Sequence, residues 1–207
     1  MNRPLEPWRQ AQFEISVASA QGFPAPRGRE IAFAGRSNAG KSSAINALCG
    51  QRSLARTSRT PGRTQLVNFF RIDDTRCLVD LPGYGFAKVG AEAKQHWQAL
   101  IGDYLAARAN LAGLVLMMDI RHPLTDSDGQ MVDWCAASGL RLLVLLTKAD
   151  KLSRGAAAST VHKVRSALAG YPIEHAVLPF SALKKTGVDD ALALLDGWFA
   201  DDWLREA

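Results

Sequence analysis

Short apolar runs alternate along the chain with longer segments whose apolar residues recur at helical spacing. Continuous apolar runs occupy residues 112–118, 141–146 and 175–180, and each is followed by a segment of helical character, at 126–138, 155–169 and 188–204. An earlier apolar run at 31–34 precedes a helix-forming run at 43–48. Strands that are apolar throughout, each followed by a helix, predict a parallel sheet that is covered on both faces.

Two further β-prone runs, at 65–72 and 76–80, flank the turn residues 73–75 and predict an antiparallel hairpin. Residues 91–110 are expected to form a helix. Its apolar face indicates core packing rather than a binding surface, and consists of Trp97, Leu100, Ile101, Tyr104 and Leu105. The expected architecture is a three-layer α/β domain with a mostly parallel six-stranded sheet, one antiparallel edge strand, and helices on both faces.

The first 29 residues are predicted to be an extension ahead of a domain that spans residues 30–207. Residues 12–18 could form a strand or an extended arm, and both alternatives stay open. Residues 22–28 are rich in proline and glycine and are expected to form a loop.

A phosphate-binding motif stands between the run at 31–34 and the helix that follows it. The eight residues read G-x-x-x-x-G-K-S and are Gly35, Arg36, Ser37, Asn38, Ala39, Gly40, Lys41 and Ser42. Glycines let backbone N–H groups surround a phosphate, and the helix N-terminus adds partial positive charge. Lys41 is expected to reach the β- and γ-phosphates, and the Ser42 hydroxyl to ligate Mg²⁺. The alternative, a glycine-rich turn without a ligand, is disfavoured by the strand–loop–helix context.

Three later motifs each follow a predicted strand. The first is Asp80, Leu81, Pro82 and Gly83, where the acid could hold Mg²⁺ through water and the Gly83 N–H could contact a γ-phosphate. The second is Thr147, Lys148, Ala149 and Asp150, where a carboxylate could accept the N1–H and N2 hydrogens of guanine, which adenine lacks. The third is Phe180, Ser181 and Ala182, where a backbone N–H could bind the guanine O6. Each tetrapeptide alone also suits an ordinary turn. Together, at the strand ends where α/β sheets bind ligands, they resemble the nucleotide motifs of GTPases.

Bulk composition narrows the setting of the protein. The chain has 207 residues, of which 47% are hydrophobic and 22% charged, as in a single globular domain. The apolar runs are too short to span a bilayer, so we expect a cytoplasmic protein without membrane contact. The three cysteines (Cys49, Cys77 and Cys135) are widely spaced, which indicates reduced, buried residues rather than a metal or redox site.

The net charge of +5 is concentrated near the N-terminus, since residues 1–63 hold ten Lys or Arg against three acidic residues. A basic end suits a polyanionic partner such as RNA, although a solvated basic surface would have the same composition.

The motifs in full resemble one family. The stretches at 35–43, 60–65 (Thr-Pro-Gly-Arg-Thr-Gln), 80–85 (Asp-Leu-Pro-Gly-Tyr-Gly), 119–124 and 147–152 are similar to those of the EngB (YihA/YsxC) family of bacterial ribosome-biogenesis GTP-binding proteins, in the Era-like branch. The resemblance covers about residues 10–200. It implies a P-loop GTPase fold, with GTP or GDP and Mg²⁺ as ligands. It also implies that Gly62, Arg63, Thr64, Gln65 and Leu66 form a switch contact, with Thr64 as the second Mg²⁺ ligand.

Three positions bear on the rate and affinity that the resemblance implies. Tyr84 follows Gly83, where Ras-like proteins have a water-orienting Gln, so hydrolysis is expected to be slow without a partner. Thr147 stands where many GTPases have Asn, and it keeps a hydroxyl but loses an amide hydrogen bond. Asn38 could ligate K⁺, as in some Era-like GTPases, or could only stabilise its own loop. Lys41, Thr64 and Gly83 are the candidate catalytic groups.

Arg121, after the run at 112–118, could contact a partner but is expected to pair with a nearby acid. The function implied by the resemblance is a GTP-dependent switch in assembly of the large (50S) ribosomal subunit, in a monomer that contacts the subunit precursor and its rRNA. The resemblance also implies a link to cell division and septation. The basic residues Arg52, Arg56, Arg59 and Arg63 lie on or beside the switch segment and could bind RNA. The alternatives are a small-molecule phosphotransferase, which the base and phosphate motifs disfavour, and a non-catalytic GTP/GDP-sensing module.

Overall fold

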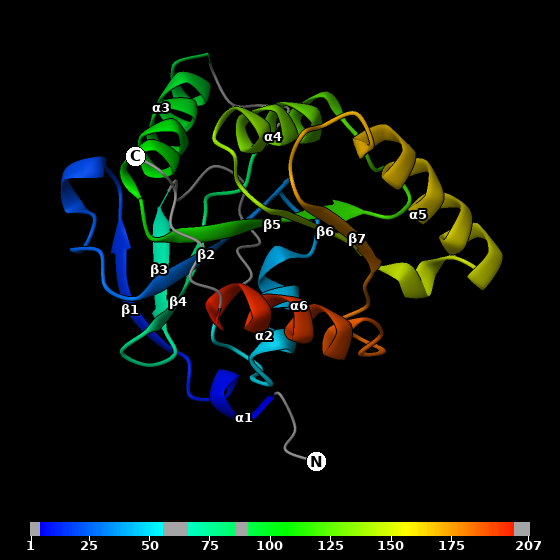
Figure 1. Ribbon diagram of the computed structural model, residues 1–207, viewed down its shortest axis with the longest axis horizontal. Helices are drawn as coiled ribbons and strands as arrows, with labels where there is room; N and C mark the ends of the chain where they lie inside the picture. Colours follow the sequence, from blue (N-terminus) through cyan, green and yellow to red (C-terminus); the bar gives the residue numbers. More distant parts are fainter. Residues whose placement is uncertain (1–4, 56–65, 86–90, 201–207) are drawn as a thin grey trace.

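A computed structural model describes residues 5–55, 66–85 and 91–200 of the chain. Its centre is a seven-stranded sheet with the order β1-β3-β4-β2-β5-β6-β7 (Figure 1). The strands are β1 (Gln12–Val17), β2 (Arg29–Gly35), β3 (Val67–Arg71), β4 (Arg76–Asp80), β5 (Leu111–Asp119), β6 (Leu142–Thr147) and β7 (His175–Pro179). β3 runs antiparallel to both of its neighbours, and β4, β2, β5, β6 and β7 are mutually parallel.

The expected α/β architecture is confirmed, with one strand more than the six predicted. The additional strand is β1, the segment that the sequence left open as a strand or an arm. It pairs with β3 at the edge of the sheet, with a register shift between Phe13 and Ile15. Five of its six residues are exposed, because an edge strand has a partner on one side only. Its mixed polar and apolar sequence therefore lacks the continuous apolar pattern of the inner strands.

In the part of the chain that the structure describes, helices cover both faces of the sheet (Figure 1). Against one face lie α3 (Ala91–Ala107), α4 (Asp126–Ala137) and α5 (Arg154–Leu168). Against the other lie α1 (Leu5–Trp8), α2 (Lys41–Leu48) and α6 (Val188–Ala200). Two short 3₁₀ turns occupy Ala20–Gly22 and Ala149–Lys151. The helix expected at 188–204 is described as far as Ala200, and residues 201–204 lie outside the described ranges.

The inner strands are buried on both faces, which explains their apolar sequences. In β2, Ile31 and Phe33 face the core under α2 and α6, while Ala32 and Ala34 face the core under α3, α4 and α5. All four side chains are at most 1% exposed. The small Ala side chains let helices lie close to the strand that leads into the phosphate motif.

The N-terminal segment is hydrogen-bonded to α6 and to the loop that follows α2. Trp8 is fully buried, and its indole Nε1 donates a hydrogen bond of 2.8 Å to Asp196 of α6. Its ring lies 5.7 Å from that of Phe199. Gln51, just after α2, donates to the carbonyl oxygen of Ala11 at 2.7 Å. These contacts hold the chain in place before it enters β1.

A buried ion pair lies at the amino end of β2. Arg108, after α3, pairs with Glu30, and the hydroxyl of Tyr104 donates to the same carboxylate at 2.9 Å. Arg108 also donates to the carbonyl oxygen of Pro24 at 2.6 Å. Because Glu30 and Arg108 are at most 3% exposed, this network fixes α3 to the sheet through groups that water cannot replace.

The three cysteines are buried and unbridged, as the sequence predicted. Within the described ranges, no helix combines the length and the apolar composition that crossing a bilayer requires.

Candidate functional site

The sequence-predicted motifs meet at the carboxyl edge of the sheet. Gly35 ends β2, Asp80 ends β4, Asp119 ends β5 and Thr147 ends β6. The four strands are neighbours in the order β4-β2-β5-β6, so their ends lie side by side. This is the edge at which open α/β sheets bind ligands.

The loop between β2 and α2 has the backbone that a phosphate cradle requires. Gly40 has a φ of 90° and caps α2, which begins at Lys41, and Asn38 has a φ of 65°. Glycine adopts positive φ without strain, and asparagine does so more readily than most residues. The loop therefore ends at a helix N-terminus, where N–H groups and the helix dipole favour an anion.

Lys41 forms an ion pair with Asp80 across this loop, and both side chains are largely buried, with 12% and 9% exposed. A bound phosphate would compete with Asp80 for the lysine ammonium. Asp80 and the Ser42 hydroxyl, at the second position of α2, are the hard oxygen donors that Mg²⁺ prefers. In the described ranges no cluster of three or more His, Cys, Asp or Glu side chains could hold a metal by itself. Mg²⁺ usually binds few protein ligands together with phosphates and water.

The segment that follows β4 packs directly on the phosphate loop. The backbone N–H of Ser37 donates to the carbonyl oxygen of Tyr84 at 2.8 Å. A Cβ atom built on Gly83 would lie 3.5 Å from the Ser37 nitrogen and 3.6 Å from the Gly35 oxygen. A side chain at this position would therefore touch the backbone of the loop.

The side chain of Tyr84 is hydrogen-bonded to α4. It is buried, and its hydroxyl donates a hydrogen bond of 2.8 Å to Asp128 of α4. Burial raises the pKa of Tyr84 well above its usual value, and the charge of Asp128 adds to this rise. The phenol therefore stays protonated and engaged with Asp128.

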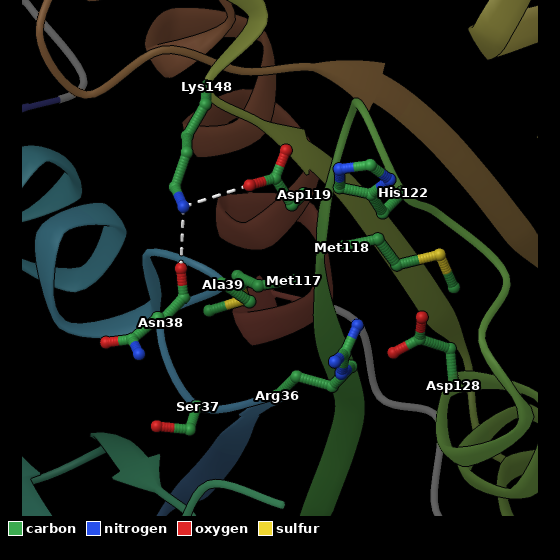
Figure 2. Close-up of a pocket in the computed structure, with 10 residues that line it drawn as sticks. All are labelled: Arg36, Ser37, Asn38, Ala39, Met117, Met118, Asp119, His122, Asp128 and Lys148. Atoms are coloured by element: carbon green, nitrogen blue, oxygen red, sulfur yellow. Dashed lines mark hydrogen bonds and ion pairs between the residues drawn. The ribbon is translucent and has the colours of Figure 1, made fainter. Parts of the chain in front are cut away.

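The motif at 147–150, which follows β6, is called the base loop here. Two of its side chains bind the phosphate loop. The Thr147 hydroxyl lies 2.5 Å from the carbonyl oxygen of Ala39 and 3.2 Å from that of Met118. Lys148, with a φ of 58°, donates to the Asn38 carbonyl oxygen at 2.7 Å and pairs with Asp119 at 2.9 Å (Figure 2). The stem of Lys148 thus spans the gap between β6 and the phosphate loop.

Asp150 is held by the third motif. The Ser181 hydroxyl donates to an Asp150 carboxylate oxygen at 2.6 Å. This hydrogen bond is the main cause that lowers the pKa of Asp150, so the carboxylate is ionised. The backbone N–H of Ala149 donates to the Phe180 carbonyl oxygen at 3.0 Å, which joins the two loops. Half-buried Ala182 follows Ser181.

Two residues near the base loop received no role from the sequence. Asp119 accepts hydrogen bonds from Arg121 at 2.6 and 2.9 Å, which confirms the expected pairing of Arg121 with an acid. The Arg121 guanidinium is the main cause that holds the pKa of Asp119 well below its usual range. Leu183, directly after Ala182, is 74% exposed. Two features of the sequence could have drawn attention to them. Asp119 is an acid at the end of a predicted strand, and Leu183 is an apolar residue in a polar loop.

A small cavity of about 180 Å³ lies beside the phosphate loop (Figure 2). Arg36, Ser37 and Ala39 line it from the loop, together with Met117, Met118, Asp119, His122, Asp128 and Lys148. Its volume is below the usual range for a drug-sized ligand.

Of the predicted switch contact, only Leu66 lies within the described residues, half-buried before β3. Gly62, Arg63, Thr64 and Gln65 lie outside them. So do Arg56 and Arg59 of the predicted basic cluster, whereas Arg52 is described and exposed.

Comparisons with known proteins point to GTP-binding proteins. Residues 30–148 match the protein family described as 50S ribosome-binding GTPase. A probable GTP-binding protein EngB from Shewanella amazonensis is 56% identical over 210 residues, covering 100% of this chain and 97% of the relative. Another from Azoarcus sp. is 58% identical over 192 residues, covering 92% of each protein.

Solved structures show the same fold at lower sequence identity. The crystal structure of a probable GTP-binding protein engB has a TM-score of 0.67 and 20% identity, covering 83% of this chain and 98% of that one. Era in complex with MgGDPNP and nucleotides of 16S ribosomal RNA has a TM-score of 0.63 and 17% identity, covering 88% of this chain and 58% of that one. With its match to the GTPase domain and full-length relatives above 50% identity, the chain belongs to the EngB family of GTP-binding proteins.

Proposed function

We propose that the protein binds GTP and GDP with Mg²⁺ at the carboxyl edge of the sheet and hydrolyses GTP slowly. The observation that carries this proposal is the direct link between the base loop and the phosphate loop, through Thr147 to Ala39 and Lys148 to Asn38. A nucleotide has a base and a phosphate chain at a fixed separation. A site that ties the two loops together is already organised for such a ligand.

Each motif has a role in the proposed complex. The backbone of residues 35–42 holds the phosphates, with Lys41 as their cation. Asp150 accepts the hydrogen bonds of the guanine edge, and the stem of Lys148 covers one face of the base. In the third motif the N–H groups of Phe180 and Ser181 already donate to Leu146 and Thr186, so the backbone N–H of Ala182 is the one that binds O6. The exposed Leu183 offers an apolar surface beside the same base.

The proposed magnesium ligands are Ser42 and Thr64, with Asp80 acting through water. Bound Mg²⁺ would neutralise charge on the β- and γ-phosphates. Asp80 already lies beside Lys41, so one carboxylate can orient both the lysine and a metal-bound water. The switch contact of residues 62–66, including Thr64, would complete the site only while a γ-phosphate is present.

The slow rate follows from Tyr84. Its hydroxyl is committed to Asp128 and its side chain is buried, so it does not orient an attacking water. Catalysis then depends on Lys41, Thr64 and Gly83 and on whatever a partner or a cation adds. Asn38 could supply a K⁺ ligand or could serve only its own turn, and comparing hydrolysis in KCl and NaCl for the wild type and Asn38→Ala decides between them.

The proposed biological role is a nucleotide-dependent switch in assembly of the 50S subunit, in a cytoplasmic monomer, with the family's link to cell division and septation. The matched family is described by its binding to the 50S ribosome, and the related Era structure contains ribosomal RNA. The basic N-terminal part of this chain suits an rRNA partner. Ordering of the switch segment by GTP would couple RNA affinity to the nucleotide state.

Two measurements test the proposal. Calorimetry should show GDP and a non-hydrolysable GTP analogue binding in the presence of Mg²⁺, with ATP unable to displace them. Co-sedimentation should show more protein on 50S particles with the GTP analogue than with GDP. Equal binding of ATP, or no nucleotide binding, would contradict the site assignment. Equal sedimentation in both states would contradict the switch.

A second candidate is a module that binds GTP and GDP without hydrolysing GTP, which the engagement of Tyr84 with Asp128 favours. A single-turnover assay with and without 50S particles separates the two. Phosphate release that 50S particles accelerate supports the GTPase, and no release in either condition supports the sensing module.

A further inference from the structure

Trp97 of α3 makes a polar contact with the segment that ends in Gly83. Its indole Nε1 donates a buried hydrogen bond of 2.9 Å to the carbonyl oxygen of Pro82. The side chain is only 8% exposed, so water does not compete for this carbonyl. The helical spacing of Trp97 indicated core packing alone, and the hydrogen bond gives the residue a second role.

The carbonyl of Pro82 and the N–H of Gly83 belong to one peptide unit. That unit is trans, and in a planar trans peptide the C=O and N–H bonds point in opposite directions. A hydrogen bond that holds the carbonyl toward α3 therefore directs the Gly83 N–H the other way. A Cβ atom built on Gly83 would contact the backbone of Gly35 and Ser37, so the fixed peptide lies beside the phosphate loop.

The indole ring of Trp97 is itself fixed by neighbours from two other elements. The Tyr84 ring meets it edge-on, with centroids 5.5 Å apart, and the Trp134 ring of α4 stacks on it at 5.9 Å. Tyr84 is anchored through its hydroxyl to Asp128, which in turn accepts a hydrogen bond from the Thr125 N–H at the start of α4. The indole cannot turn without displacing this cluster, so its N–H keeps one direction.

We infer that Trp97 is a positioning residue for the terminal phosphate. By fixing the Pro82–Gly83 peptide, it orients the Gly83 N–H and so favours a nucleoside triphosphate over a diphosphate. This inference rests on the proposed nucleotide site and adds the residue that sets its preference between the two nucleotides.

The test compares two affinities in variants of the full chain. Trp97→Phe keeps an aromatic ring and removes the donor. A second variant is used if Trp97→Phe folds poorly. It replaces Trp97 site-specifically by benzothienylalanine, which has sulfur in place of the indole N–H and keeps the shape of the ring. Trp198→Phe is the matched control, because it makes the same substitution at a buried tryptophan in the core on the other face of the sheet. Dissociation constants for GDP and for a non-hydrolysable GTP analogue are measured by calorimetry with Mg²⁺.

Loss of one neutral hydrogen bond should weaken the GTP analogue about five- to tenfold and leave GDP affinity unchanged. The control should keep the wild-type ratio of the two constants. An unchanged ratio in the Trp97 variants, equal weakening of both nucleotides, or a shift toward the GTP analogue would overturn the inference. Failure of the wild-type protein to bind either nucleotide would instead overturn the proposed function.

Discussion

The hydroxyl of Thr147 lies 2.5 Å from the carbonyl oxygen of Ala39, so the end of β6 is hydrogen-bonded to the middle of the phosphate loop. Thr147 is 3% exposed, and its partner is also buried. Loss of the hydroxyl would remove this hydrogen bond from the buried Ala39 carbonyl and weaken the connection between the base loop and the phosphate loop.

Thr147→Val, which keeps the side-chain shape, is therefore expected to weaken GDP binding about tenfold, from the loss of about 1–3 kcal/mol. Thr147→Ser, which keeps the hydroxyl, should bind within about twofold of the wild type. Calorimetry at constant Mg²⁺ measures both. Wild-type affinity in Thr147→Val would show that the link between the loops does not organise the site.

Asp80→Asn tests whether Asp80 holds Mg²⁺ through a water molecule. The wild type should bind the GTP analogue more tightly with Mg²⁺ than with EDTA. In the variant this ratio should fall toward one, because a neutral amide accepts a weaker hydrogen bond from a metal-bound water than a carboxylate does. Asp74→Asn is the matched control, since it removes the same charge from an exposed side chain at the tip of the β3–β4 hairpin. A magnesium effect that persists in Asp80→Asn would exclude this role.

Asp150→Asn should change the preferred base. A carboxylate accepts two hydrogens from guanine, whereas an amide can donate one hydrogen to the O2 carbonyl of xanthine. The variant is expected to bind XDP at least about ten times more tightly than GDP, the reverse of the wild type, in a competition assay. If GDP stays the preferred ligand, Asp150 does not contact the base edge.

Breaking the buried pair between Glu30 and Arg108 should destabilise the fold without touching the site. Arg108→Met leaves the Glu30 carboxylate buried without its cation and is expected to lower the free energy of unfolding by about 3–5 kcal/mol. The double variant Glu30→Gln with Arg108→Met should recover part of that loss. Urea denaturation at pH 7 measures both, and a single variant as stable as the wild type would contradict the expectation.

Alkaline pH should destabilise the protein through Cys49. Burial raises the pKa of this thiol to about 12, whereas an unfolded cysteine has a pKa of about 8.5. The raised folded pKa makes the stabilisation complete below pH 8.5 and progressively lost between there and about pH 12, by about 1 kcal/mol per pH unit. Urea unfolding at pH 8 and pH 10.5, with a reducing agent, should show a smaller loss for Cys49→Ala than for the wild type. Equal losses would mean that this thiol does not govern the pH effect.

The sequence predicted the elements that repeat a simple pattern. The inner strands are continuous apolar runs because both of their faces are buried, and the helices between them have clear spacing. The edge strand β1 carries Gln12, Glu14 and Ser16 among its apolar residues and was indistinguishable from an arm, because the pairing with β3 that defines it is a long-range contact.

For the candidate site, the motifs predicted which loops meet, because strand ends of a parallel sheet share an edge. They did not predict the contacts between the loops. The bond from Trp97 to Pro82 and the pairing of Lys148 with Asp119 depend on where a helix lies and how a long side chain turns. Residue spacing carries no information on either.

The hydrogen bond from Trp8 to Asp196 joins residues 188 positions apart in the chain. During synthesis, the indole therefore emerges long before the helix on which it docks. A growing polypeptide carries an uncovered tryptophan until α6 has been made, and a product that stops short of α6 leaves it uncovered. Docking of Trp8 thus waits for the synthesis of α6.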